Sequence, residues 1–208
     1  TPLHYSIFLG HINIAMLLIE RGASVTSKDN NGATLLHTIC LHGDNQFLDL
    51  LISMGLDINQ PDYFGITPIF YAAMFNQAIT VIFLYKREAE LDILIEKGND
   101  LFLTAVDNDS EDVVKALIDI GFDINYTNDY NQTALHLAIE NKSLNIILLL
   151  LKYGIDTNIN SENGSVLHEA IAINSPEIVS FLMLYGVNAN LLDNQGNTAF
   201  HKLCLTLG

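Results

Sequence analysis

The segment NGATLLHTICLHGDNQFLDLLISMGLDIN, residues 31–59, contains the signals for two helices and for the turns that end them. Thr34 stands where the N-cap of a helix is expected, and apolar residues then recur at helical spacing. Gly43 allows a reversal into a second helix, which is apolar on more than one side, as expected of a helix between two neighbours. Gly55 ends that helix in a left-handed cap position. The stretch therefore predicts a helix–turn–helix unit followed by a polar turn.

This unit recurs along the chain with a period close to 33 residues. A tetrapeptide similar to TPLH opens each copy near residues 1, 34, 67, 133, 165 and 198, and a degenerate copy fills residues 100–132. The opening threonines and the motif histidines are Thr1, Thr34, Thr67, Thr133 and Thr198, with His4, His37, His136, His168 and His201. A glycine follows each opening position by 21 residues in most copies, at Gly22, Gly55, Gly121, Gly154 and Gly186.

A 33-residue period with T-P-L-H, a helical apolar pattern and a closing glycine resembles the ankyrin repeat over the whole chain. The resemblance implies an all-α solenoid of stacked helix–turn–helix units, with β-hairpin or loop fingers between them. We expect a single array over residues 1–208, with about six repeats and a seventh that is cut short. Because both ends fall inside a repeat, we expect the sequence either to be part of a longer array or to lack its capping repeats.

Four positions depart from the repeat. Phe70 replaces the motif histidine and cannot supply its hydrogen bonds. Glu88 replaces the closing glycine, where a side chain costs roughly 1 kcal/mol, so the second helix either runs on or ends in a distorted finger. Asp100 opens the degenerate copy and can still serve as an N-cap. The step before Ser165 is one residue short, which predicts a shortened finger there.

The charge balance of the chain argues against several classes of partner. Nine basic residues face 24 acidic ones, and the net charge is −15. Binding to nucleic acid and to anionic membranes depends on Lys and Arg, so neither is expected. No apolar run reaches the length of a membrane span, and the first residues lack the basic and apolar regions expected of a signal peptide. Cys40 and Cys204 do not form a disulfide framework, and we expect both to be buried thiols in a reducing compartment.

The seven histidines do not predict a catalytic or metal site. Five of them occupy one position of the repeat, which the resemblance explains by structural hydrogen bonds to the neighbouring backbone. His42 lies at a variable position and is either a contact residue or solvated. Nucleophile, phosphate-loop, zinc-protease and dinucleotide motifs do not occur in the sequence. We therefore expect no catalytic residue, no metal and no cofactor.

The same resemblance implies that a partner binds the concave face, formed by the finger tips and the last turn of each first helix. At these positions the third repeat is apolar throughout, whereas most other repeats are polar. An exposed apolar patch with aromatic and Met anchors is typical of an interaction site. The alternative is that the fingers bury each other's rings, and Tyr71 stays unassigned. The predicted partner-binding residues are Leu41, His42, Tyr63, Phe64, Ile66, Met74, Phe75, Glu96, Asp107, Asn108 and Tyr130.

The sequence thus predicts a cytoplasmic, monomeric, non-enzymatic module that binds another protein carrying apolar or basic side chains. Three alternatives remain at this point. The chain could be the substrate-targeting arm of a larger enzyme, or a secreted effector that acts in the cytosol of a host cell. It could also be an architectural or self-associating scaffold.

Overall fold

The computed structural model describes residues 1–91 and 99–206, without the side chains of residues 205 and 206. These residues contain thirteen α-helices and two isolated β-bridges, but no longer strand. The chain forms two compact units, Thr1–Ile95 and Glu96–Gly208. Each unit repeats the same pairing of helices, so the predicted all-α fold is confirmed.

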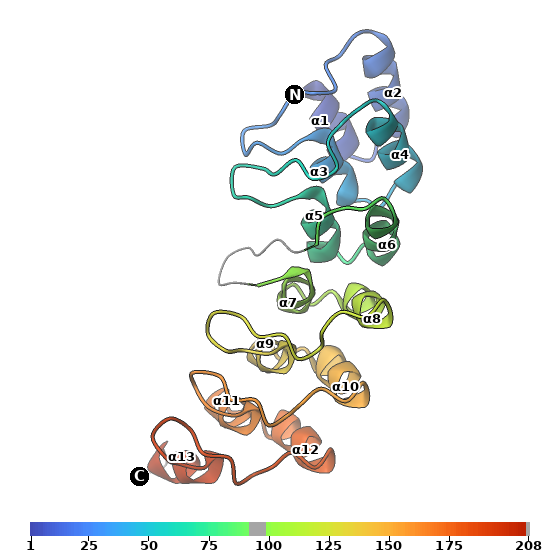
Figure 1. Ribbon diagram of the computed structural model, residues 1–208. Helices are drawn as coiled ribbons and strands as arrows, with labels where there is room; N and C mark the ends of the chain where they lie inside the picture. The colour runs from blue at the N-terminus through green and yellow to red at the C-terminus, as the bar shows by residue number, and fades with distance from the viewer. Residues whose placement is uncertain (92–98, 207–208) are drawn as a thin grey trace. The chain divides into compact units, whose positions relative to one another are not determined.

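The first unit is built from three helix pairs. Its helices are α1 (Pro2–Phe8), α2 (Ile12–Glu20), α3 (Leu35–Cys40), α4 (Asn45–Ser53), α5 (Pro68–Met74) and α6 (Ala78–Lys86). The first helices, α1, α3 and α5, pack side by side, and each also packs against the second helix of its own pair (Figure 1). The loops from α2 to α3 and from α4 to α5 project from the same side of the unit.

The second unit follows the same plan. Its helices are α7 (Leu101–Asp107), α8 (Glu111–Asp119), α9 (Ala134–Glu140), α10 (Leu144–Lys152), α11 (Val166–Ala172), α12 (Pro176–Leu184) and α13 (Ala199–Thr206). Helices α7, α9, α11 and α13 form the row of first helices, each in contact with the next. The connecting loops again project on one side of the row (Figure 1).

The first helices begin where the TPLH-like motif predicts. Pro2 and Pro68 occupy the first helical position, where proline loses no hydrogen bond. In the degenerate repeat the carboxylate of Asp100 accepts a hydrogen bond from the backbone N–H of Leu103 at 2.8 Å. That repeat therefore keeps its helix cap although it lacks the motif. The N-cap residues are Thr1, Thr34, Thr67, Asp100, Thr133 and Ser165.

The backbone adopts the left-handed conformation at three recurring positions of the repeat. The first lies in the turn between the two helices of a pair, the second follows the second helix, and only the second is predicted from the sequence as a recurring feature. The third lies in the loop before the next first helix, at Gly32, Gly65, Asn131, Gly164 and Gly196. Positive φ angles occur in the turn at Gly10, Gly43, Asn76, Asp109, Lys142 and Asn174, and after the second helix at Gly22, Gly55, Glu88, Gly121, Gly154 and Gly186.

Glu88 takes the left-handed conformation although it has a side chain. Its φ is 61°, and α6 ends at Lys86 with the nine-residue length of the other second helices. The prediction that this helix could run on is therefore wrong. The backbone N–H of Ala89 donates to the carbonyl of Leu84 at 3.1 Å, and both side chains are buried. This packing holds the turn in place in spite of the strain at Glu88.

The loop before the sixth repeat is shorter than the others, as predicted. In each of the other loops whose residues are all described, a backbone N–H donates to the carbonyl four residues later, as from Asp62 to Ile66 at 2.9 Å. Here Ser161 donates to Gly164, only three residues later, at 2.9 Å. The turn in this loop is therefore one residue shorter, which accounts for the 32-residue spacing of this repeat.

The core consists of apolar side chains between the two rows of helices in each unit. Phe70 is fully buried where most other repeats carry the motif histidine. As a result, the hydroxyl of Thr67 is buried and has no hydrogen-bond partner among the described residues. Cys40 is buried as expected, but the expectation for Cys204 is wrong, because it lies on an exposed side of α13.

Candidate functional site

One buried carboxylate, that of Asp62, holds the loop between α4 and α5. Its Oδ1 accepts hydrogen bonds from the backbone N–H groups of Phe64 and Ile66, both at 2.9 Å. Its Oδ2 accepts a hydrogen bond from the hydroxyl of Tyr71 at 3.0 Å. Because both carboxylate oxygens accept hydrogen bonds, Asp62 holds the backbone of the loop in place. The side chains at the tip of the loop point outward.

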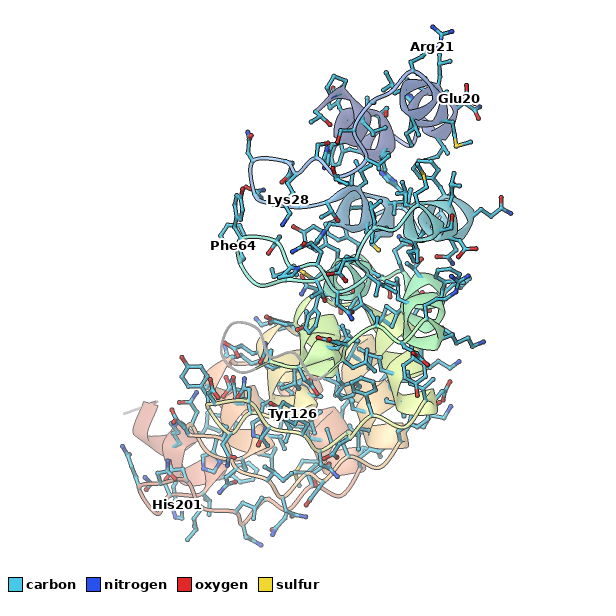
Figure 2. The ribbon with its side chains drawn as sticks, turned by 45° about the horizontal axis from the view of Figure 1, so that its top comes forward. Glu20, Arg21, Lys28, Phe64, Tyr126 and His201 are labelled. Atoms are coloured by element: carbon cyan, nitrogen blue, oxygen red, sulfur yellow. The ribbon has the colours of Figure 1, made fainter. Side chains whose placement is uncertain are left out.

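Tyr63 and Phe64 form the tip of this loop, and each exposes 72% of its surface. The backbone N–H of Tyr63 donates to the carbonyl of Asn31 in the preceding loop at 2.9 Å. Its ring lies over Gly32, where an added Cβ would come within 2.5 Å of the ring atom Cδ1. Figure 2 shows Phe64 at the outer edge of its loop. The neighbouring loops thus touch, but both rings remain open to solvent.

The helix ends supply the other predicted positions of this unit. Phe75, at the end of α5, exposes 52% of its surface, whereas Leu41, Ile66 and Met74 are half-buried. His42 is exposed, but it is not simply solvated. Its Nε2 donates to the backbone carbonyl of Phe8 at 2.7 Å, and the two rings meet edge to face with centroids 6.5 Å apart.

Tyr71, which the sequence left unassigned, supports the loop from below. Its half-buried ring packs edge-on against His37, with centroids 5.0 Å apart and an interplanar angle of 82°. Burial raises the pKa of the Tyr71 phenol well above its usual range, and the hydrogen bond to Asp62 raises it further. The hydroxyl therefore keeps its proton and acts as the donor to Asp62.

Two exposed rings of the first repeat were not predicted. Tyr5 and Phe8 of α1 expose 64% and 55% of their surfaces. Phe8 occupies the same repeat position as Leu41 and Met74, so extending the 33-residue register to the first copy would have found it. No sequence signal marks Tyr5, because the neighbouring helix decides its exposure. We call the exposed rings on the loops and first helices of the first unit the aromatic face: Tyr5, Phe8, Tyr63, Phe64 and Phe75.

The remaining predicted positions belong to the second unit, and one of them, Glu96, lies outside the described residues. Asp107 and Asn108 are exposed at the end of α7. The amide of Asn141 donates to the carbonyl and the carboxylate of Asp107, both at 3.2 Å. Tyr130 exposes 45% of its surface on the loop before α9. The helix end and the loop tip of the second unit are thus more polar than those of the first.

Acidic side chains recur on the first helices of the second unit. Glu140 ends α9, and its carboxylate accepts a hydrogen bond from Gln132 at 3.2 Å. Burial raises the pKa of Glu169 on α11, and the charge of Glu140 raises it further. These carboxylates favour cationic groups of a partner over anionic ones.

The buried motif histidines connect successive repeats. In the second repeat the backbone N–H of Thr34 donates to Nδ1 of His37 at 3.0 Å, so the proton of the neutral ring is on Nε2. That Nε2 donates to the carbonyl of Ile66 in the next loop at 3.0 Å. Equivalent bonds to a carbonyl in the next loop are made by His4 at 3.1 Å, His136 at 3.3 Å and His168 at 3.0 Å.

The same histidines are poor candidates for acid–base chemistry. Burial lowers the pKa of His4 and His37, and it lowers the pKa of His136 to about 4. His201 bonds to Thr198 in the same way but is exposed. Within the described part of the chain, no three His, Cys, Asp or Glu side chains are grouped to hold a metal ion. None of the helices described is long and apolar enough to cross a membrane.

Comparison with known proteins agrees with this architecture. The family model for ankyrin repeats in three copies matches residues 3–95 and again residues 69–161. This chain therefore belongs to the ankyrin-repeat family.

Individual relatives show the same relationship. The B-cell lymphoma 3 protein homolog of Mus musculus is 28% identical over 164 residues, which cover 76% of this chain and 37% of that protein. Ankyrin repeat protein OPG189 of Monkeypox virus is 33% identical over 131 residues, which cover 62% of this chain and 22% of that protein. The chain thus spans well under half the length of these curated relatives. The crystal structure of the human ASB11 ankyrin repeat domain has a TM-score of 0.82 at 24% identity, covering 96% of this chain and 90% of that one.

Proposed function

We propose that this chain binds another protein through the loops and first helices, and that it performs no catalysis of its own. The observation that carries the proposal is the exposure of Tyr63 and Phe64, both 72%, on a loop that Asp62 holds in place. Fully burying one such ring contributes about 2 kcal/mol. A loop that is already ordered also lowers the entropic cost of association. The family supports this proposal, since stacked repeats offer extended binding surfaces.

The partner is expected to present apolar side chains to the aromatic face and basic side chains to the acidic positions of the second unit. Aromatic and Met residues are typical anchors of protein interfaces. The net charge of −15 favours association with a basic surface. We place this interaction in the cytoplasm, with the chain acting as a monomer on the face that corresponds to the concave face of the family.

The proposal is tested by a triple variant, Tyr63→Ser with Phe64→Ser and Phe75→Ser. The matched control replaces three exposed apolar side chains on or beside the second helices, Met54, Ile79 and Tyr85, which expose 42%, 76% and 42%. Each protein is used for affinity purification from a cell lysate, followed by quantitative mass spectrometry.

We expect the aromatic variant to lose the proteins that the wild type captures, and the control to retain them. Circular dichroism should show unchanged helicity for both variants, because all six side chains are exposed. Capture of the same proteins in the same amounts by the aromatic variant would show that the proposal is wrong.

Self-association is a second candidate function with some support. Two aliphatic side chains, Ile79 on α6 and Leu184 on α12, expose 76% and 78% of their surfaces to solvent. Exposed apolar patches also mark contacts between copies of one chain. Light scattering over a range of protein concentrations tests this alternative, since a scaffold of this kind would increase in mass with concentration whereas a monomer would not.

A further inference from the structure

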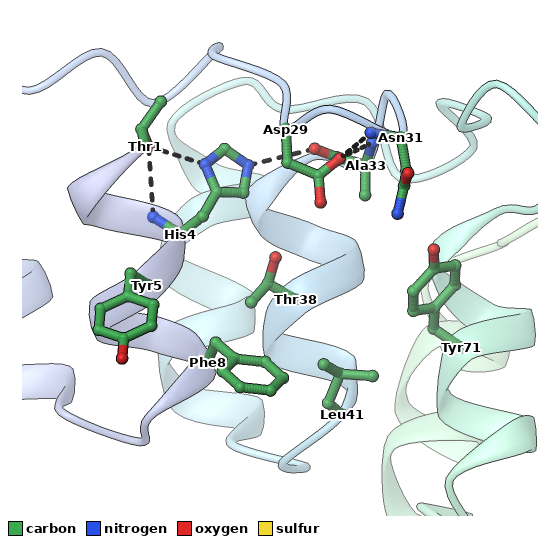
Figure 3. A pocket seen from close by; sticks show the side chains of 10 residues that line it. All are labelled: Thr1, His4, Tyr5, Phe8, Asp29, Asn31, Ala33, Thr38, Leu41 and Tyr71. Atoms are coloured by element: carbon green, nitrogen blue, oxygen red, sulfur yellow. Dashed lines mark hydrogen bonds between the residues drawn. The ribbon is translucent and has the colours of Figure 1, made fainter.

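A pocket of about 330 Å³ opens on the first unit, between α1, α3, α5 and the loop that precedes α3 (Figure 3). The rings of Tyr5, Phe8 and Tyr71 and the side chain of Leu41 supply its apolar walls. Asp29 and Asn31 of the loop supply its polar rim, and Thr38 its floor. The pocket thus combines aromatic walls with a carboxylate.

One carboxylate oxygen of Asp29 is available to a ligand. Its Oδ1 accepts hydrogen bonds from the backbone N–H groups of Asn31 and Ala33, at 2.8 and 2.9 Å. Its Oδ2 accepts no hydrogen bond from the described residues, and Figure 3 shows this oxygen pointing into the pocket above Thr38.

The next repeat shows why this oxygen is unused. There, Oδ2 of the equivalent carboxylate, Asp62, accepts a hydrogen bond from the Tyr71 hydroxyl at 3.0 Å. At the position of Tyr71 the second repeat has Thr38, whose short side chain donates to the carbonyl of Thr34 at 3.3 Å instead. The repeat pattern is the same, but a shorter side chain leaves the second carboxylate without its donor.

The electrostatics of the pocket favour a cation. Among the described residues that line it there is no Lys or Arg. His4 lies at its upper edge, and burial lowers the pKa of this ring, so it is uncharged at neutral pH. The negative charges of Asp62 and Asp29 both contribute to the raised pKa of Tyr71 at the opposite wall.

We propose that this pocket receives an arginine side chain of the partner protein. A guanidinium group stacks on aromatic faces and carries five N–H donors, so it can pack between the rings and donate to Oδ2 of Asp29 at the same time. An ammonium group is more strongly hydrated and does not stack in this way. The inference rests on the proposed function and names the chemistry of the partner at one point of the surface.

The probe is the peptide acetyl-Gly-Gly-Arg-Gly-Gly-amide, titrated into the isotope-labelled complete protein and followed by NMR. We expect the backbone amide signals of Thr38 and Leu41 to shift. The same peptide with citrulline, which keeps the shape of arginine but lacks its charge, should bind about threefold to tenfold more weakly. Asp29→Asn should weaken binding of the arginine peptide by a similar factor.

The chain itself shows that Asp29→Asn can keep the turn. Asn128 occupies the same place before α9, and its Oδ1 accepts hydrogen bonds from the backbone N–H groups of Tyr130 and Gln132 at 3.1 and 3.0 Å. The matched control is Asp193→Asn in the second unit, which removes one negative charge from an equivalent turn. This control should leave peptide binding unchanged.

Three results would overturn the inference: equal binding of the arginine and citrulline peptides, equal or stronger binding of a lysine peptide, or equal weakening by Asp29→Asn and Asp193→Asn. Each can occur while the aromatic triple variant still loses its partners. The failure of this inference is therefore distinguishable from the failure of the proposed function.

Discussion

Each buried motif histidine joins the start of its own helix to the loop of the next repeat. His136 receives a hydrogen bond from the backbone N–H of Thr133 and donates to the carbonyl of Gly164. The ring can do both only while it is neutral, because a protonated ring has no acceptor. Burial lowers the pKa of His136 to about 4, and the ring is therefore neutral in the folded protein at neutral pH.

This histidine should make the protein less stable in acid. The pKa of His136 is about 4 when folded and about 6.5 when unfolded, so between these values the unfolded chain binds the proton first. The free energy of unfolding should therefore fall as the pH decreases through this window, by about 2 kcal/mol for this residue between pH 7 and pH 5. Urea unfolding at both pH values measures the loss.

Two variants complete that measurement. His136→Gln should be less stable at pH 7 but should lose less stability on acidification than the wild type. His11→Gln removes an exposed histidine and should show the full loss of the wild type. An equal loss in wild type and His136→Gln would contradict the assignment.

The hydroxyl groups of the opening threonines allow a second test of the hydrogen bonds around the motif histidines. The hydroxyl of Thr133 lies 2.9 Å from Nδ1 of His136, whereas the buried hydroxyl of Thr67 has no partner among the described residues, because Phe70 stands in place of the histidine. Thr133→Val should lower the free energy of unfolding by about 1 kcal/mol more than Thr67→Val. Chemical denaturation of both variants measures the difference, and equal losses would show that the hydroxyl bond contributes nothing.

The turns that follow the second helices determine where those helices end. All six second helices have nine residues, and each is followed by a left-handed residue two positions later. At four of the six turns within a helix pair, an Asn, Asp or Lys takes that conformation in place of glycine. Burial of the adjoining apolar residues maintains these turns, so the repeat tolerates side chains that local preferences disfavour.

Glu88→Gly should stabilise the protein. A side chain in the left-handed region costs about 1–2 kcal/mol, and part of the gain is offset because glycine loses more freedom on folding. We expect the free energy of unfolding to rise by about 1 kcal/mol, measured by urea denaturation. Glu90→Gly, two residues away, is the control and should be neutral or destabilising, because Glu90 does not have a positive φ.

The spacing of Thr34 and Gly55 predicted the helices of each repeat, because caps and turns depend on local chemistry. The same 33-residue register predicted the positions of the exposed aromatic residues in the third repeat. The pocket beside Asp29 could not be predicted in this way. Its free carboxylate oxygen depends on Thr38 being too short to reach it, and the exposure of Tyr5 depends on the neighbouring helix. Both features depend on how neighbouring repeats pack against each other, and the sequence of a single repeat does not describe that packing.

The net charge of −15 restricts the kind of partner that the whole molecule can bind. With nine basic residues in 208, the chain can neutralise few phosphates, so binding to DNA would release few counterions. We expect no binding to a duplex DNA of about 20 base pairs at about 150 mM salt, measured by fluorescence anisotropy at protein concentrations up to about 50 µM. Binding that weakens steeply with added salt would contradict this expectation.

A partner protein should contact the aromatic face of the first unit. Site-specific photocrosslinking detects this contact, with benzoylphenylalanine placed at Phe64 and, as the control, at Ile79 on α6, since both side chains are highly exposed. The crosslinked proteins from a cell lysate are identified by mass spectrometry. We predict that position 64 crosslinks to the proteins that the wild type captures and that position 79 does not. Crosslinking of those proteins from position 79 alone would show that the partner does not bind the aromatic face.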